Sequence, residues 1–219
     1  MPTAVMHFHP PMTKKAATVI SHSLSETTAM PCRSYGLPIA ACKVGSILAG
    51  IEGTICSECY AGKNCYTLFP AVLHAQHKRL ESLDDPLWVD ALVAQIGSDP
   101  FFRWHDSGDL QSLHHLNRIV EVCMRTPNTM HWLPTREKLI VEQGLYKYGP
   151  LPDNLVVRMS AVYFDAKANP IKGIDTTSGS HKDQPPLGFE CRKPYQNNTC
   201  GDCRACWDKE VKHISYAAH

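Results

Sequence analysis

The chain has 219 residues, a net charge of +1 and 10 cysteines. Its 22 basic and 21 acidic residues nearly balance, which gives no electrostatic footprint for nucleic acid or for an anionic membrane. No apolar run approaches the ~20 residues that span a bilayer, and MPTAVMHFHPPMTKK lacks the pattern of a secretion signal, so we expect a cytoplasmic protein.

Three zones are expected within a single domain that spans residues 1–219. Residues 1–68 are rich in Gly, Pro, Ser and Cys and are expected to form loops with short elements. Residues 69–164 alternate between helical and strand patterns. Residues 165–219 return to polar, turn-rich sequence, although the tail VKHISYAAH can fold back as a strand.

The middle zone predicts a βαβαβ core. Apolar stripes over residues 72–83 and 88–96 indicate two helices before it. The segments FFRWH, TMHWLPT and NLVVRMSAVYF predict three strands, and helical patterns in residues 113–123 and in EKLIVEQGLYKYG separate them. This order implies parallel strands with right-handed crossovers. We therefore expect an α/β fold, as a partial barrel or small mostly parallel sheet with helical crossovers, flanked by cysteine-rich loop zones at both ends of the chain.

A closely spaced set of cysteines near the end of the chain predicts a metal site. Thiols crowded in a reducing compartment are more often metal ligands or catalytic groups than disulfides. Two consecutive two-residue gaps suit a [4Fe–4S] cubane, because each thiolate can bind a different iron, and suit a single zinc ion less well. We predict a [4Fe–4S] cluster here, with zinc as the alternative and disulfides or buried thiols as the non-metal alternative. The set is Cys191, Cys200, Cys203 and Cys206.

A second cysteine set near the start of the chain is less regularly spaced. CSEC is an ordinary ligand pair, and wider gaps separate it from two earlier cysteines. We predict a second centre of the same kind, for which Cys65 could replace one ligand. Ligands from both zones could instead meet at one centre, whereas Cys123 is expected to pack in the core. The predicted second set is Cys32, Cys42, Cys56 and Cys59.

Polar residues follow the first two predicted strands. The carboxyl ends of parallel strands meet at one rim, where functional groups collect. His105, Asp106, Asp109 and Arg136 are therefore candidates for a rim that holds a substrate or an anionic cofactor, and Arg158 inside the third strand could join them. A structural alternative is that Asp109 caps the helix that begins near Gln111.

The order of several motifs resembles the phage gene product 88 family: CRSYGLPIAAC, CSECYA, FRWHDSGD, HWLPTRE, CGDCRACW and a terminal VKHISYAAH. The resemblance implies a viral protein that acts in the host cytoplasm. The chain is more distantly similar to radical S-adenosylmethionine enzymes, which join a cysteine-bound [4Fe–4S] cluster to a parallel α/β barrel. It departs from them because their Cys-x3-Cys-x2-Cys loop is missing.

Three functions compete. The first is an iron–sulfur protein whose cluster is structural or transfers electrons, and the second is a radical S-adenosylmethionine-like enzyme with a small-molecule substrate. The third is a zinc-stabilised module that binds a host protein or nucleic acid, for which Tyr60, Tyr66 and Trp207 could stack on bases. The near-neutral charge disfavours nucleic acid, and no membrane partner is expected.

Overall fold

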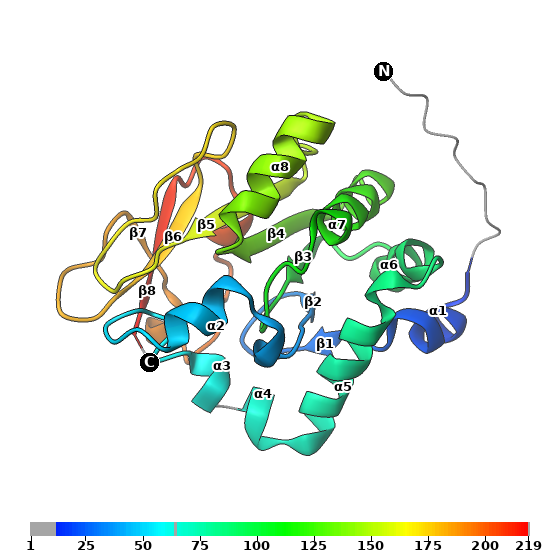
Figure 1. Ribbon diagram of the computed structural model, residues 1–219, viewed down its shortest axis with the longest axis horizontal. Coiled ribbons are helices and arrows are strands. Elements are labelled where there is room, and N and C mark those ends of the chain that lie inside the picture. The colour runs from blue at the N-terminus through cyan, green and yellow to red at the C-terminus, as the bar shows by residue number, and fades with distance from the viewer. Residues whose placement is uncertain (1–11, 64, 219) are drawn as a thin grey trace.

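The computed structural model describes residues 12–63 and 65–218. They form an eight-stranded sheet in the order β1-β2-β3-β4-β5-β6-β8-β7, in which neighbouring strands are parallel except β1 and β2 (Figure 1). The expected α/β fold with a mostly parallel sheet is confirmed. The strands are β1 Ser25–Glu26, β2 Arg33–Tyr35, β3 Phe101–Trp104, β4 Met130–Thr135, β5 Leu155–Ser160, β6 Thr177–His181, β7 Phe189–Glu190 and β8 His213–Ala217.

Helices connect the strands. The α-helices are α1 Lys14–Ser21, α2 Val44–Ala49, α3 Tyr60–Lys63, α4 Cys65–Leu68, α5 Pro70–Glu81, α6 Trp88–Ile96, α7 Leu113–Arg125 and α8 Lys138–Tyr148. Short 3-10 turns are η1 Ile39–Ala41, η2 Ser82–Asp84, η3 Lys193–Tyr195 and η4 Ala205–Trp207. Among the described helices, none combines the length and apolarity that crossing a lipid bilayer requires.

The predicted βαβαβ core is present as β3, α7, β4, α8 and β5. In its register, His131 of β4 pairs with Phe102 of β3 and with Leu155 of β5. Helix α7 begins at Leu113 because the Ser112 side chain caps it, accepting a hydrogen bond from the backbone N–H of His115 at 3.0 Å. The alternation of strand and helical patterns was therefore a sufficient guide to this part of the fold.

The sheet is wider than the three predicted core strands. Strand β2 pairs with β3 at one side of the core, and β6, β8 and β7 extend it beyond β5. Of these added strands, only the C-terminal β8 is expected from the sequence. The others are short or polar, as in TSGSH of β6, so their sequences lack the apolar alternation that identifies a half-buried strand.

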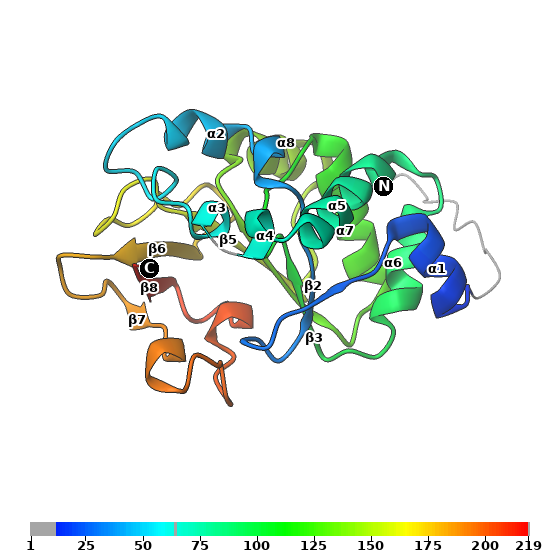
Figure 2. The same cartoon turned by 90° about the horizontal axis from the view of Figure 1, so that it is seen from below.

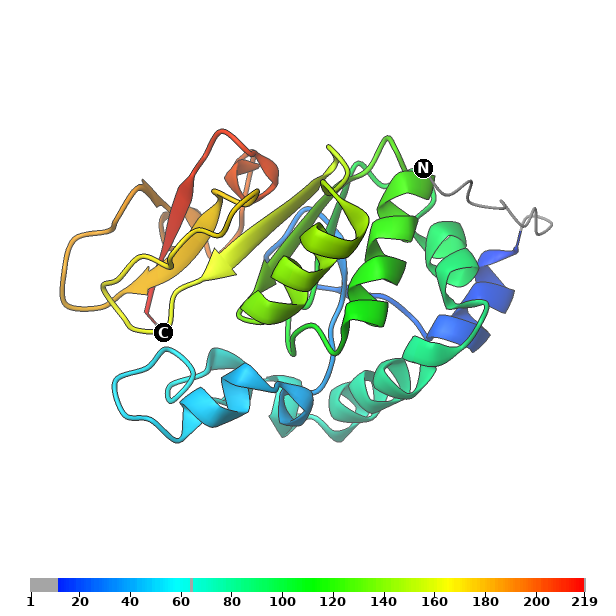
Figure 3. The ribbon, with the colours of Figure 1, turned by 45° about the horizontal axis from the view of Figure 1, so that its top comes forward.

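One face of the sheet carries the main hydrophobic core. Figure 3 shows α7 and α8 lying across this face, with α6 and α1 beside them. Phe102, Trp104 and Leu133 are fully buried here and belong to one apolar cluster with Trp88 of α6 and Ile119 of α7. Burying each such side chain contributes about 1.5–3 kcal/mol, so this layer is the main source of stability.

The opposite face is covered by the C-terminal segment. Phe101 and Trp132 alternate with the core residues along their strands and therefore point to this face. The Trp207 ring lies 5.3 Å from the Phe101 ring and 5.4 Å from the Trp132 ring, centroid to centroid, and its indole N–H donates to the carbonyl of Phe102 at 2.9 Å. Figure 2 shows this orange and red segment on the side of the sheet away from α7 and α8. The cysteine-rich segment 191–207 is thus fixed to the sheet.

A buried histidine makes the core sensitive to acid. His131 is fully buried, its Nε2 atom lies 2.8 Å from the hydroxyl of Thr126, and its ring stacks on Trp104. Burial lowers the pKa of His131 to about 3. The unfolded chain, where this pKa is near 6.5, binds the proton more strongly than the folded protein, so stability falls as the pH decreases from 6.5 toward 3.

We expect His131→Gln to weaken this acid destabilisation. The free energy of unfolding, measured by urea titration between pH 7 and pH 4, should fall less steeply in the variant, by up to about 1.4 kcal/mol per pH unit. His114→Gln, on the exposed side of α7, is the matched control and should keep the wild-type slope. Equal slopes in wild type and His131→Gln would contradict this account.

Candidate functional site

Four C-terminal cysteines surround one small pocket. Cys191 directly follows β7, Cys206 lies in η4, and a turn in which the Cys203 N–H donates to the Cys200 carbonyl at 3.0 Å places the other two between them. All four line the same pocket, whose other walls include Phe189, Trp207 and Ile214. The thiols that are closest in sequence therefore also share one cavity in the fold.

Arg158 of β5 holds this segment in place. Its side chain is fully buried on the sheet face that the segment covers. The guanidinium donates to five carbonyl oxygens, including those of Ala205 at 2.8 Å, Cys206 at 3.1 Å and Asp208 at 2.7 Å. One charged side chain thus fixes the backbone on both sides of the Cys206 thiol.

Cys32 lies with the C-terminal thiols, although the chain order groups it with the N-terminal ones. It immediately precedes β2, and the Cys200 N–H donates to the carbonyl of Ala29 at 2.9 Å, which joins the two zones. Burial raises the pKa of Cys32 to about 12, with further contributions from Cys200 and Cys206, and Arg103 opposes the shift. Five thiols from both ends of the chain therefore gather on this face of the sheet.

The other thiols of the predicted second set form a separate group. A Cβ atom on Gly45 would lie 3.6 Å from the Cys42 sulfur and 3.7 Å from the Cys56 sulfur, so these two thiols flank the same point. Burial raises the pKa of Cys42 to about 12 and also raises that of Cys56, and Cys59 interacts electrostatically with both. The fold thus brings together three of the four residues in this set and separates Cys32 from them.

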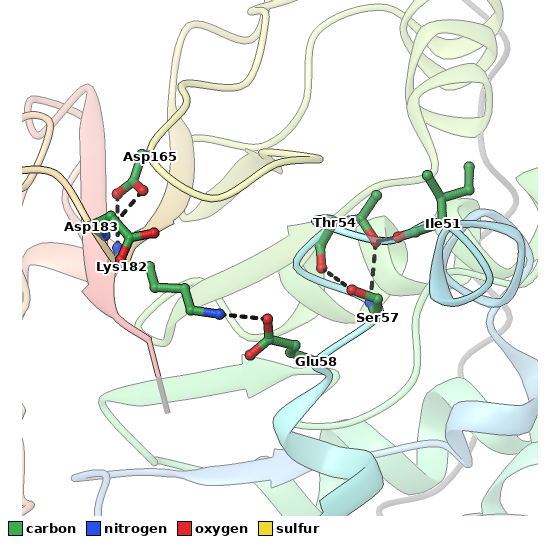
Figure 4. Close-up of polar contacts among 7 residues, drawn as sticks. All are labelled: Ile51, Thr54, Ser57, Glu58, Asp165, Lys182 and Asp183. Atoms are coloured by element: carbon green, nitrogen blue, oxygen red, sulfur yellow. Dashed lines mark hydrogen bonds and ion pairs between the residues drawn. The ribbon is translucent and has the colours of Figure 1, made fainter.

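The loop that carries this second group is attached to the loops after β5 and β6. The Ile55 N–H donates to the carbonyl of Val162 at 2.9 Å, and Lys182 forms an ion pair with Glu58 at 2.6 Å (Figure 4). Asp165, with φ of +56°, accepts from the backbone N–H groups of Lys182 and Asp183 (Figure 4). Figure 3 shows the blue to cyan segment with α2 and α3 along one edge of the molecule.

Within the described part of the chain, no three His, Cys, Asp or Glu side chains converge on a point suited to a single metal ion. The described cysteines are free thiols, and the side chain of Cys65 lies outside the described part. Cys123 is fully buried within the apolar cluster of α7, as its position on an apolar stripe predicts. The remaining thiols therefore form the two groups described above.

Asp109, one of the rim candidates, follows β3 and forms hydrogen bonds with the end of β4. Its carboxylate accepts from the Thr135 hydroxyl at 2.6 Å and from the backbone N–H of Arg136 at 2.9 Å. Burial raises the pKa of Asp109 to about 6, and these hydrogen bonds oppose the shift. The alternative that Asp109 caps the next helix is wrong, because Ser112 provides that cap.

His105 and Asp106 are enclosed at the same rim. They are 3% and 1% exposed, respectively, and His105 has a left-handed φ of +54°. Burial lowers the pKa of His105 to about 3, so the ring is neutral, and neither ring nitrogen has a hydrogen-bond partner among the described residues. The Tyr60 hydroxyl donates to the Asp106 carbonyl, and α3 thus covers this end of β3. Substrate would reach these side chains only if the covering segment moved.

Arg136 is the rim candidate with the most accessible side chain. Its guanidinium donates to the carbonyl of Ala161 at 3.1 Å, and its Nε atom is buried without a described partner. It opposes the effect of burial on the pKa values of Cys42 and Cys56. The polar rim and the second thiol group are therefore parts of one region.

Two further residues of the C-terminal site, Arg103 and Tyr216, were not predicted, and Arg158, which was expected at the polar rim, holds the C-terminal segment instead. Arg103 of β3 lies 4.5 Å above the Trp132 ring, and the Tyr216 hydroxyl of β8 lies 3.5 Å from the Cys206 sulfur. Arginine in the middle of an otherwise apolar strand, as in LVVRMS, drew attention to Arg158 but did not show which segment it contacts.

The comparisons with known proteins identify a family. The gene product 88 family model matches residues 11–209 of the chain. No curated protein and no solved structure matches it. Because the match covers most of the chain, including both thiol groups, this protein belongs to the gene product 88 family.

Proposed function

We propose that this protein binds an iron–sulfur cluster through Cys191, Cys200, Cys203 and Cys206, and that the cluster stabilises the fold or transfers electrons. The observation that carries the proposal is that these four thiols line one pocket. The proposed setting is the reducing cytoplasm of an infected bacterium, where cysteines remain thiols.

The chemistry of the pocket fits a cationic metal core. Burial raises the pKa values of Cys191 and Cys200, and that of Cys206 to about 12, so these thiols do not ionise readily by themselves. A metal core would compensate the thiolate charges and release the protons. When bound, a cluster supplies either a crosslink between chain segments or a one-electron centre.

The arrangement favours a cluster over a single zinc ion. Zinc needs four donors converging on one point at about 2.0–2.3 Å, whereas each thiolate of a [4Fe–4S] cubane binds a different iron. The turn from Cys200 to Cys203 and the next step to Cys206 present three sulfurs in succession around the pocket. If the protein contains zinc and no iron, we would instead propose a zinc-stabilised module that binds a host protein.

The second thiol group supports a second candidate function, an enzyme. Cys42, Cys56 and Cys59 lie beside Arg136 and Asp109 at the carboxyl ends of parallel strands. Three cysteine ligands on a cubane would leave one iron for an exogenous ligand, as in radical S-adenosylmethionine chemistry. Incubation of the reduced protein with S-adenosylmethionine tests this candidate: reductive cleavage of the cofactor supports it, and absence of both binding and cleavage rejects it.

Metal analysis of protein prepared without oxygen tests the proposal. We expect a brown protein with about four iron and four acid-labile sulfide per chain for one centre, or about eight of each for two centres. A colourless protein with one zinc per chain and no labile sulfide would instead establish the zinc module.

Removal of a proposed ligand should affect both metal content and folding. We expect Cys203→Ser and Cys206→Ser to lose the iron of the C-terminal centre and to become less soluble, because metal binding contributes folding free energy. Cys123→Ala, in the apolar core, is the control and should keep the iron. Either serine variant with full iron and sulfide would contradict the ligand assignment.

The variants Cys191→Ser and Cys32→Ser test whether Cys191 or Cys32 is the fourth ligand of the C-terminal centre. We expect Cys191→Ser to lose the C-terminal centre and Cys32→Ser to keep it, because four thiols still line the pocket in the latter. Iron and sulfide per chain are measured in both. The opposite result would make Cys32 the fourth ligand and would show that one centre joins both ends of the chain.

A further inference from the structure

Two arginine side chains flank the C-terminal thiol group without an ion-pair partner. Arg158 is fully buried, and Arg103 is partly buried with its Nε atom inaccessible and without a hydrogen-bond partner. No described carboxylate lies within 4.0 Å of either guanidinium. The C-terminal site therefore contains two positive charges that contact no carboxylate in the described part of the chain.

The surroundings compensate the charge of Arg158 less than that of Arg103, because burial lowers the pKa of Arg158. Asp175 and Asp208 interact electrostatically with Arg158, but both are exposed, and Asp175 forms an ion pair with Lys212 at 3.0 Å. Burial opposes the charge of Arg103, but Tyr60 and then Asp106 outweigh it and raise the pKa of Arg103. Burial of a cation is costly unless an anion compensates it, so the surroundings of Arg158 are suited to an additional anionic group.

The arginines lie close enough to the thiols to affect their charge. Arg103 interacts electrostatically with Cys32, Cys200 and Cys206, favouring their thiolate forms, and Arg158 does so with Cys206. Arg103 also donates to the sulfur of Met30 at 3.2 Å and to the hydroxyl of Tyr60 at 3.4 Å, and both acceptors are uncharged groups. Both cations therefore act on the same group of sulfurs.

Tyr216 adds a polar group to the same site. Its hydroxyl lies 3.5 Å from the Cys206 sulfur. A phenol keeps its proton at neutral pH, so it can donate a hydrogen bond to a thiolate sulfur. Strand β8 thereby contributes directly to the surroundings of a proposed ligand, and hydrogen bonds to ligand sulfurs raise the reduction potential of a cluster.

We propose that Arg103, Arg158 and Tyr216 compensate the negative charge of a metal–thiolate centre at this site and favour its reduction by one electron. This inference rests on the proposed iron–sulfur function. Four thiolates around a [4Fe–4S] core of charge +2 give a net charge of −2, and one electron from a one-electron donor protein changes it to −3. Fixed positive charge stabilises the more negative state more strongly. The site is thus built for electron transfer rather than for structural support alone.

The test is a redox titration of the reconstituted protein with dithionite and mediator dyes, followed by visible absorption. Arg103→Gln removes one positive charge, and Tyr216→Phe removes the hydroxyl group. We expect both variants to keep the iron and sulfide content of wild type and to show a more negative reduction potential. Arg103→Lys keeps the charge and should remain closer to wild type than Arg103→Gln.

A matched control separates this effect from a general effect of mutation. Tyr195→Phe removes another tyrosine hydroxyl from the C-terminal zone, one that is exposed and hydrogen-bonded to Glu190, and should leave the reduction potential unchanged.

Full iron content with identical reduction potentials in wild type, Arg103→Gln and Tyr216→Phe would overturn this inference and leave the cluster proposal intact. If wild type takes up no iron and sulfide, the proposed function fails, and this inference fails with it. If Arg103→Gln fails to assemble the centre, the reduction potential of Tyr216→Phe tests the inference by itself: a potential equal to that of wild type would overturn it.

Discussion

The hydrogen bonds from Arg158 to the backbone of the C-terminal segment are the interaction on which the site depends. The side chain projects from β5, near the middle of the sheet, and its planar guanidinium reaches carbonyl oxygens from residue 205 to residue 211. Hydrogen bonds of charged donors contribute about 1.5–3 kcal/mol each, more than neutral ones. Without them, the segment would keep the contacts of Trp207 with the sheet but would lose the hydrogen bonds that fix its backbone on both sides of the Cys206 thiol.

The two faces of the sheet have different roles because its side chains alternate. On one face, Phe102 and Leu133 pack against helices and supply most of the apolar burial. On the other, Phe101, Trp132 and Arg158 support the cysteine-rich segment: Arg204 lies over the Phe101 ring, Trp207 packs on Trp132, and Arg158 donates hydrogen bonds. The same strands thus stabilise the fold and position the candidate centre. A substitution on the second face is expected to change the thiol pocket more than it changes the packing of the main core.

The sequence was sufficient to predict the central α/β unit but not the whole sheet. Regular apolar spacing identified β3, α7, β4, α8 and β5, whereas β6 has the sequence TSGSH and is a strand only because β5 and β8 pair with it. Tertiary pairing of this kind leaves no local pattern in a chain. The C-terminal zone therefore has more regular structure than its polar composition indicates.

The site was also only partly predictable. Spacing alone grouped the four C-terminal cysteines that line one pocket, because close thiols in a turn must remain near one another in space. Spacing could not place Cys32, whose position depends on β2 pairing with β3 and on the contact between Cys200 and Ala29. The strand-end rule brought His105 and Asp109 to one rim but did not indicate that α3 and neighbouring segments bury it.

The central claim is that the C-terminal thiols hold iron. A crystal structure of the anaerobically prepared protein, with anomalous diffraction collected at the iron absorption edge, tests it most directly. The account predicts anomalous density from a compact group of iron atoms between the sulfurs of Cys191, Cys200, Cys203 and Cys206. Thiols joined in disulfides, a lone zinc ion, or an iron-free pocket between these four residues would contradict it.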